Sequence, residues 1–494
     1  MQKKQTILVV ASLLVVVLSV TLAYFTAQII GKGKSVTINS ADLKIIFTDS
    51  DGSISGTNIE PGKWNVTKTF TIENKSNETY KYNIVIQDLV NTFVTNGYLQ
   101  YKITSTNGGY NMTEFKDVPK SETATDTILA YSASIDVGVT QSYTIEFKYA
   151  NDESVDQSDD MGRKLSGTLF ITEGTEEPVT LLSQLLADKS TRPGARTSFS
   201  SVLTTDNTKT LYTGTENGTT VYYFAGNTTN NWVKFANLYW RIIRTNHDGS
   251  IRLLYSGTNH NTTEGYIGIS AFNTSYNSPV YVGYKYGTSI GSNRQNTNDS
   301  TIKKYVDNWY SNNLSSYSKY ISTEAVYCND RELAPGLTYN TGNTTFYYAP
   351  RERLSTNKTP TYNCTNNKDA FSGSNSEAKL TYPIGLMTAD EIAYAGGKVT
   401  PDLPSPYAWY YLNSAGGSIT GSTFWWLMSP NRKEGSKSLV CDVSGSGDPG
   451  YLANDFVNEG GAVRPAVSLK TCTLWTSGNG APETPYEIST TSGC

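Results

Sequence analysis

The segment WNVTKTFTIE, residues 64–73, carries the clearest structural signal in this chain. Apolar and polar side chains alternate along it, the apolar ones being Trp64, Val66, Phe70 and Ile72. A period of two is that of a β-strand with one buried face. The segments YKYNIVIQ, SYTIEFKY and LSGTLFIT repeat the alternation further along the chain. Strands of this kind need a second sheet to cover their apolar face, so residues 35–173 are predicted to form a β-sandwich of roughly seven strands.

The N-terminus predicts export. Lys3 and Lys4 precede an uncharged, mainly apolar stretch that runs to Gly31. About 20 apolar residues span a bilayer as a helix, and basic residues at its start favour a cytoplasmic N-terminus. Small residues around Ala23 also fit a cleavage site. We therefore predict a hydrophobic helix within residues 1–34, which is either a transmembrane anchor or a signal peptide, and both place the remaining chain outside the cytoplasm.

Composition excludes some functions and favours others. The net charge is −4 and the isoelectric point is near 5.5, whereas a nucleic-acid-binding protein shows a basic patch or stripe. Charged residues make up 17%, and the chain contains 35 Tyr and 41 Gly, a mixture that suits exposed sheets and polar loops. The two histidines leave little material for a metal site or histidine-based catalysis.

All five cysteines lie in the C-terminal part, and none of them are spaced as in zinc or redox motifs. In an exported protein, disulfides are the expected state. Four cysteines allow three pairings, and sequence order alone does not choose among them. We favour the local closures Cys328–Cys364 and Cys441–Cys472, which leave Cys494 as a spare or intermolecular thiol.

Residues 174–196 are predicted to form an acidic linker and a short helix within VTLLSQLLAD. Beyond it, LYWRIIR and SIRLLYS flank an Asp-Gly turn and predict a β-hairpin. One helix is expected after the capping residue Ser300, and another at the capping box of Thr388 and Glu391. Few helices among many short strands predict an α+β domain over residues 197–494.

Two resemblances add to this interpretation. The first rests on LAYFTA, SADLKIIF, IEPGKWNVTKTFTIENKSNETYKYNIVI and SGTLFIT. Over about residues 1–173 the chain resembles camelysin and TasA-type exported proteins, the fibre-forming matrix subunits of Gram-positive biofilms. This resemblance implies a jelly-roll-like sandwich and, in the fibre-forming members, assembly by donation of an N-terminal strand, a route that an uncleaved anchor would oppose.

The second resemblance covers most of residues 197–490. Its segments are YWRIIRTNHDGSIRLLYSG, IKKYVDNWYSNNL, VYCNDR, YPIGLMTADEIAYAGG, FWWLMSP, GAVRPAVSLK and GNGAPETPYEI. They resemble bacterial surface domains of C-type-lectin-like fold related to formylglycine-generating enzymes. Those enzymes use a closely placed pair of cysteines, which Cys441 and Cys472 do not match, so their activity is not carried over.

No catalytic residue, metal ligand or cofactor is predicted, and the chain is not expected to be an enzyme. His247 falls in a turn and His260 in a polar loop, and no serine elbow or paired-histidine motif is present. Asp390 and Glu391 are assigned to the first turn of their helix. Glycosidase carboxylates are paired in space rather than in sequence, so an enzyme with unrecognised catalytic residues stays open.

A binding face is predicted in the segment 431–459, which is rich in Ser, Gly, Asp and Asn and is expected to form loops around a short strand at LVCDVS. Loops on a rigid core commonly carry recognition residues, and Tyr, Arg and Asn are frequent among them. The predicted ligand-binding residues are Asn431, Arg432, Asp448, Tyr451 and Asn454. The neighbouring Trp425 and Trp426 are assigned to the core.

Together these patterns predict a mainly β and α+β cell-surface protein of a bacterium, anchored or secreted, that serves display, adhesion or recognition of an extracellular protein or glycan. The expected partners are that ligand, the membrane through the N-terminal segment, and a second copy through the sandwich, with no nucleic acid. A structural subunit of a matrix fibre is the first alternative, and a secreted enzyme is the second.

Overall fold

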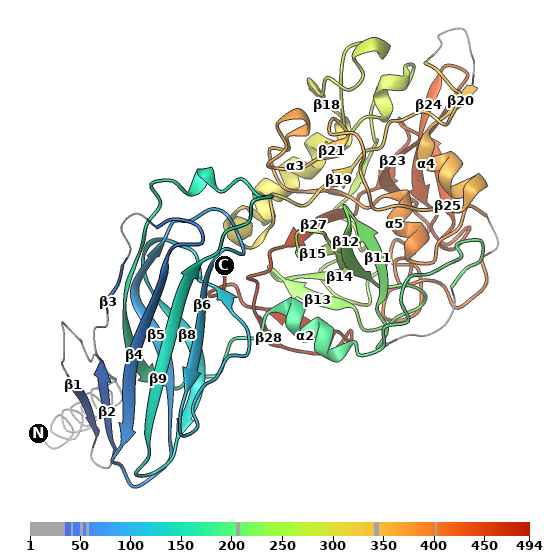
Figure 1. Ribbon diagram of the computed structural model, residues 1–494. Helices are drawn as coiled ribbons and strands as arrows, with labels where there is room; N and C mark the ends of the chain where they lie inside the picture. The colour runs from blue at the N-terminus through green and yellow to red at the C-terminus, as the bar shows by residue number, and fades with distance from the viewer. Residues whose placement is uncertain are drawn as a thin grey trace, which may run out of the picture. The chain divides into compact units, whose positions relative to one another are not determined.

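The computed structural model describes residues 35–40, 43–49, 53–55, 59–203, 208–339, 345–400 and 403–494, with side chains from residue 59 onward. Strands make up 37% and helices 13% of the chain, so the fold is mainly β, as predicted. The chain divides into two compact units, Met1–Glu177 and Pro178–Cys494 (Figure 1). The hydrophobic helix predicted in residues 1–34 lies outside the described residues, and no helix within them is long and apolar enough to cross a membrane.

The N-terminal unit contains two mainly antiparallel sheets. The first has six strands in the order β1 (Ser35–Ser40), β2 (Leu43–Asp49), β4 (Asn65–Asn74), β9 (Thr140–Tyr149), β6 (Leu99–Ser105) and β7 (Lys116–Asp117). The second has four strands in the order β3 (Ser53–Ser55), β10 (Leu165–Glu173), β5 (Tyr80–Asn91) and β8 (Ser121–Ile135). Roughly seven strands were expected, and the additional ones are the short β3 and β7 and the N-terminal hairpin β1–β2.

The two sheets of this unit enclose one apolar core (Figure 1). Alternate side chains of β4 and β9 point into it, among them Ile72, Ile145 and Phe147, whereas β5 and β10 each bury a run of consecutive residues. The predicted period of two therefore corresponds to strands with one buried face, and β4 shows the alternation most clearly in its second half.

The C-terminal unit is built on a nine-stranded sheet. Its main path runs β22 (Gly385–Leu386), β27 (Pro465–Leu469), β15 (Ile251–Tyr255), β14 (Leu238–Thr245), β13 (Trp232–Phe235), β29 (Tyr486–Ile488) and β28 (Trp475–Ser477), with β11 (Tyr212–Glu216) and β12 (Thr219–Tyr223) joined through β14. The predicted hairpin is confirmed as β14 and β15, which pair antiparallel. The strand β29 near the chain end pairs parallel with β13, so the end of the unit closes on its beginning.

A six-stranded sheet forms the second layer of this unit. It contains β16 (Ile269–Ser270), β26 (Gly461–Ala462), β23 (Trp425–Glu434), β24 (Lys437–Val443), β25 (Leu452–Phe456) and β20 (Thr345–Tyr347). Two small sheets pair β17 (Lys285–Tyr286) with β18 (Asn298–Asp299) and β19 (Tyr327–Cys328) with β21 (Ala370–Phe371). Trp425 and Trp426 of β23 are fully buried, as predicted.

Three of the four helices in the described part of the chain begin behind a capping side chain, and α4 does not. The four are α2 (Leu181–Asp188), α3 (Thr301–Asn313), α4 (Ala349–Glu352) and α5 (Ala389–Tyr394). The Ser300 side chain accepts a hydrogen bond from the backbone of Lys303 at the start of α3, and Thr388 and Glu391 form the predicted capping box of α5. Short 3₁₀ turns cover Ser158–Asp160, Pro279–Val282, Ile290–Ser292, Ser315–Tyr320 and Ser376–Ala378, and a π turn covers Arg353–Asn357.

Candidate functional site

The segment 431–459 is mostly strand: the short strand expected at LVCDVS is present, and the prediction of loops on either side of it is wrong in large part. It contains the end of β23, all of β24 and all of β25, and the main loop left between strands is 444–451. Its polar composition favours loops, but β24 pairs with strands on both sides and buries Leu439, Cys441 and Val443. Burial in a central strand therefore outweighs local composition in this segment.

Asn431 is buried and turned inward, so it is not available to a ligand. Only 5% of the residue is exposed, and its Nδ2 donates a hydrogen bond to the sulfur of Cys441 at 3.4 Å. The other predicted residues reach the surface to different degrees: Arg432, Tyr451 and Asn454 are partly exposed, and Asp448 is exposed.

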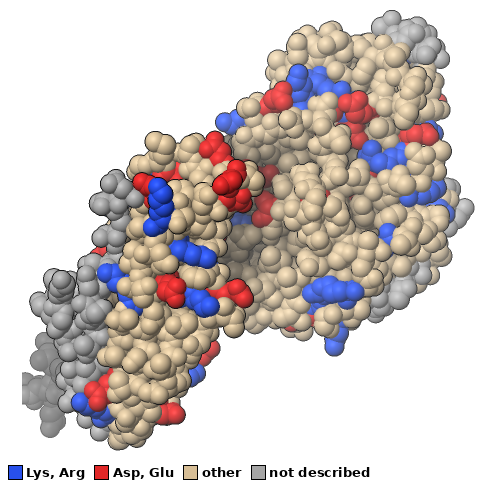
Figure 2. All heavy atoms as spheres, viewed as in Figure 1, with Lys and Arg blue, Asp and Glu red and all other residues tan. Residues whose placement is uncertain are grey.

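We define the arginine–tyrosine face as four partly exposed residues, Tyr347, Arg351, Arg432 and Tyr451, of which Arg432 and Tyr451 were predicted. Tyr347 of β20 pairs in register with Arg432 of β23. The guanidinium of Arg351 in α4 lies 3.8 Å from the ring centroid of Tyr347, a cation–π contact. Figure 2 shows Lys and Arg side chains interspersed with Asp and Glu on the visible face of the C-terminal unit.

The pKa of Tyr451 responds to burial and to the charges around it. Partial burial raises the pKa of Tyr451, the charges of Asp442 and Asp448 raise it further, and Arg432 and Arg351 act in the opposite direction. The Arg432 guanidinium also donates to the carboxylate of Glu434 at 3.0 Å. The cation–π contact of Arg351 and the hydrogen bond of Arg432 hold the two guanidinium groups at the surface. The sheet beneath them has β24, which is buried on both faces, as a central strand.

A second candidate is a buried cluster of ion pairs between the nine-stranded sheet and α5. Arg244 donates to Glu216 at 2.8 Å and to Glu391 at 2.9 Å, and Arg252 donates to the same Glu391 oxygen at 2.8 Å. These four side chains are at most 4% exposed. The sequence signal for this cluster was the presence of Arg244 and Arg252 in the otherwise apolar segments LYWRIIR and SIRLLYS, because a buried arginine needs a partner.

The carboxylates of this cluster remain ionised at neutral pH. Burial alone would raise the pKa of Glu216, but the charge and hydrogen bonds of Arg244 outweigh it and lower that pKa to about 2. Burial likewise opposes ionisation of Glu391, and the charges of Arg252 and Arg244 outweigh it and lower the pKa. Neither group is therefore suited to donate a proton in general acid catalysis.

A neighbouring group of three charges lines the same space. Arg353 binds Asp390 through two hydrogen bonds of 2.8 and 2.7 Å, and it binds Asp330 at 3.0 Å. Burial raises the pKa of Asp330, which Arg353 partly offsets. The space between these side chains measures about 20 Å³, enough for about one water molecule. Asp390 and Glu391 do lie in the first turn of α5, and each also binds an arginine. This arrangement stabilises the fold and has no room for a substrate.

The disulfide prediction is half right. Cys328 and Cys364 are bonded, with their Cα atoms 5.6 Å apart. The expected Cys441–Cys472 bond is wrong, because Cys472 bonds to Cys494 and Cys441 is a free, buried cysteine. The chain end folds back beside Leu474, whose carbonyl accepts a hydrogen bond from Ser489, and this brings the last residue to Cys472.

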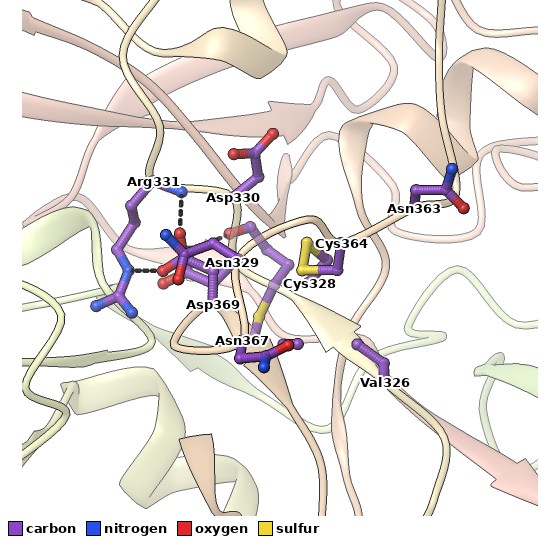
Figure 3. Close-up of a disulfide and its surroundings, with 12 residues drawn as sticks. Val326, Cys328, Asn329, Asp330, Arg331, Asn363, Cys364, Asn367 and Asp369 are labelled. Atoms are coloured by element: carbon purple, nitrogen blue, oxygen red, sulfur yellow. Dashed lines mark hydrogen bonds and ion pairs between the residues drawn. A yellow bond between two sulfur atoms is a disulfide. The ribbon is translucent and has the colours of Figure 1, made fainter. Parts of the chain in front are cut away.

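Buried polar side chains fix both segments that the first disulfide joins (Figure 3). Asp369 accepts hydrogen bonds from Nε and from the backbone N–H of Arg331, at 2.6 and 3.0 Å. Asn329 donates to the carbonyls of Val282 and Met428 and accepts from the backbone of Tyr284. The neighbourhood of the disulfide is therefore rigidly built.

Comparison with known proteins adds no family. No known protein family and no curated protein matches this chain. A solved structure described as "AvmM Catalyzes Macrocyclization in Alchivemycin A Biosynthesis" is similar over 30% of this chain and 100% of that chain, with 9% identity and a TM-score of 0.15. A TM-score this low carries no argument, so the fold and function of this chain are inferred from its own residues.

Proposed function

We propose that this chain is an exported bacterial cell-surface protein whose C-terminal unit recognises an extracellular protein or glycan through the arginine–tyrosine face. The observation that carries the proposal is that Tyr347 of β20 pairs in register with Arg432 of β23 and holds Arg351 of α4 against its ring. Arg and Tyr dominate the binding energy of many protein interfaces, and a rigid support reduces the entropy lost on binding.

Two disulfides in the C-terminal unit support an extracellular location. Disulfides form and persist in oxidising compartments and are rare in the cytosol. The apolar stretch behind Lys3 and Lys4 supplies the export signal or anchor that this location requires. In this proposal the N-terminal sandwich, of camelysin or TasA type, displays a C-terminal domain of lectin-like type.

The alternative function, a fibre subunit, would need an edge strand that pairs with another chain. The long strand β8 lies at an edge of its sheet, but its features oppose such pairing. An edge strand recruits another chain through unpaired backbone groups. In β8 the hydroxyls of Ser121 and Thr125 both donate to the carbonyl of Thr123, and Thr127 donates to the carbonyl of Thr125. The register of β8 with β5 is also repeatedly interrupted, and such bulges discourage pairing with another chain.

The test is a binding screen with the full chain, purified in detergent with its disulfides formed, against glycan arrays and extracellular proteins. Truncation of a central interface residue typically costs 1–2 kcal/mol, so Arg432→Ala and Tyr451→Ala should each weaken binding roughly tenfold. Lys304→Ala is the matched control, since Lys304 is an exposed cation on α3. Absence of any binding by the folded chain, or equal losses in all three variants, would contradict the proposal.

A further inference from the structure

A cavity of about 290 Å³ lies beside the Cys328–Cys364 disulfide, apart from the arginine–tyrosine face. Its lining residues are Glu216, Asn217, Glu324, Val326, Tyr362, Cys364, Asn367, Ala370, Ser372, Ser374 and Asn375. The volume falls near the lower end of the range for small-molecule sites, about 300–1,000 Å³. We propose that this cavity is a second binding site, which takes an uncharged, hydroxyl-rich ligand of the saccharide class.

A disulfide and side-chain hydrogen bonds fix the walls of the cavity. Cys328 in β19 pairs in register with Ala370 in β21, and the disulfide ties the same residue to Cys364 (Figure 3). The side chain of Asn375 donates to the carbonyls of Asn367 and Ala370, at 2.7 Å in each case, and so holds the opposite rim. A preformed site loses little conformational entropy when it binds a ligand.

Hydrogen-bonding groups in this cavity remain available. Within the described part of the chain, the side-chain amides of Asn217 and Asn367 have no hydrogen-bond partner, since only their backbone atoms are engaged. Glu324 is exposed and receives one hydrogen bond, from the Thr323 hydroxyl to Oε1 at 3.1 Å. A carboxamide both donates and accepts and a carboxylate only accepts, which matches sugar hydroxyls, because each hydroxyl can do either.

The charges around the cavity disfavour an anionic ligand. No lysine or arginine is among the residues that line it. The Glu216 carboxylate is engaged by Arg244 and by the backbone and ring of His247. The Glu324 carboxylate has no cationic partner among the described residues, so a negatively charged sugar would meet uncompensated negative charge.

The apolar part of the lining indicates how the ligand would pack. Val326, Ala370 and the disulfide offer a small apolar wall to the C–H groups of a sugar ring. Both faces of the Tyr362 ring are occupied, by the stacked ring of Tyr394 at 3.9 Å and by Arg244 at 4.4 Å. Ring stacking is therefore excluded as the main interaction, and hydrogen bonds to Asn217, Asn367 and Glu324 must supply specificity.

The test uses the full chain in detergent and titration calorimetry with neutral mono- and disaccharides and with glucuronate. Binding of a neutral sugar should weaken about fivefold in Asn217→Ala and in Asn367→Ala, since one net hydrogen bond is lost in each. Asn357→Ala, an exposed asparagine outside the cavity, and Arg432→Ala should leave this binding unchanged. Glu324→Gln should raise the affinity for glucuronate relative to the neutral sugar, because it removes the repelling charge.

A weak sugar site has a Kd of about 1 mM. The proposal would be overturned if no neutral sugar binds at concentrations up to about ten times that value. It would also be overturned by binding that survives both asparagine variants, a preference of the unmodified chain for glucuronate, or selective binding of peptides instead of sugars. Loss of sugar binding in Arg432→Ala but not in Asn367→Ala would assign the ligand to the arginine–tyrosine face. That outcome would refute the second site and leave the proposed recognition function intact.

Discussion

Replacement of Glu391 by glutamine tests whether the buried ion cluster stabilises the C-terminal unit. The change keeps the size of the side chain and removes the charge that Arg244 and Arg252 share, at 2.9 and 2.8 Å. Removal of one partner of a buried ion pair leaves an uncompensated buried charge and costs about 3–5 kcal/mol. Glu391→Gln should therefore lower the free energy of unfolding by that amount.

The loss translates into a measurable change in melting temperature. An unfolding entropy of about 2.1 cal/mol/K per residue, over the roughly 317 residues from Pro178 to Cys494, gives about 0.7 kcal/mol/K. The expected decrease in the melting temperature of this unit is therefore about 4–8 °C. Differential scanning calorimetry of the full chain, with tryptophan fluorescence to follow the C-terminal unit, measures it.

Glu487→Gln is the matched control for this substitution. Glu487 binds Lys234 at 3.2 Å, but the two side chains are 45% and 39% exposed, and such surface pairs contribute less than about 1 kcal/mol. Its melting temperature should fall by at most about 1.5 °C. If the melting temperature of Glu391→Gln also falls by no more than about 1.5 °C, the structural role of the cluster is refuted. If the stability is unchanged but the turnover of a substrate is lost, the chain is an enzyme.

Two further predictions concern the strand β24. The thiol of Cys441 should resist maleimide in the native chain and react fully after denaturation, since burial raises its pKa to about 12, and peptide mapping without reduction should find the other four cysteines in the two observed bonds. Rapid native labelling or a bond to Cys441 would contradict the structure. Asp442→Asn should raise stability at pH 7 by about 1–3 kcal/mol. Oδ2 of Asp442 is buried with no hydrogen-bond partner among the described residues, and burial, followed by the charge of Asp455, raises the pKa of Asp442. The folded state holds the proton of the Asp442 carboxyl more tightly than the unfolded state does. The stability difference between the variant and the wild type should therefore grow as the pH rises above about 4, as measured by urea titrations. A difference that does not depend on pH would refute the raised pKa of Asp442.

The fold was predictable where local patterns agree with tertiary structure. The alternation around Phe70 and Ile72 depends only on which face of the strand is buried, and the same sheet pattern is present in the structure. The helix starts at Ser300 and Thr388 were predictable because a capping hydrogen bond joins residues three apart in sequence.

The site was less predictable because its contacts join residues that are far apart in the chain. An arginine within an apolar strand signals a buried partner, but the pairing of Arg252 with Glu391 spans 139 residues. The partner of Cys472 depended on how the chain end folds back. Asn431 was assigned to a loop from composition, whereas pairing of β23 with β24 buries it against Cys441.

The measurement that tests the extracellular location most directly is protease accessibility of the full chain on intact bacterial cells, with a tag after Cys494. Export predicts that added protease removes the tag without lysis and that both disulfides are present before any oxidant is added. A tag that is protected until the cells are lysed, together with reduced cysteines, would place the C-terminal unit in the cytoplasm and contradict a role in extracellular recognition.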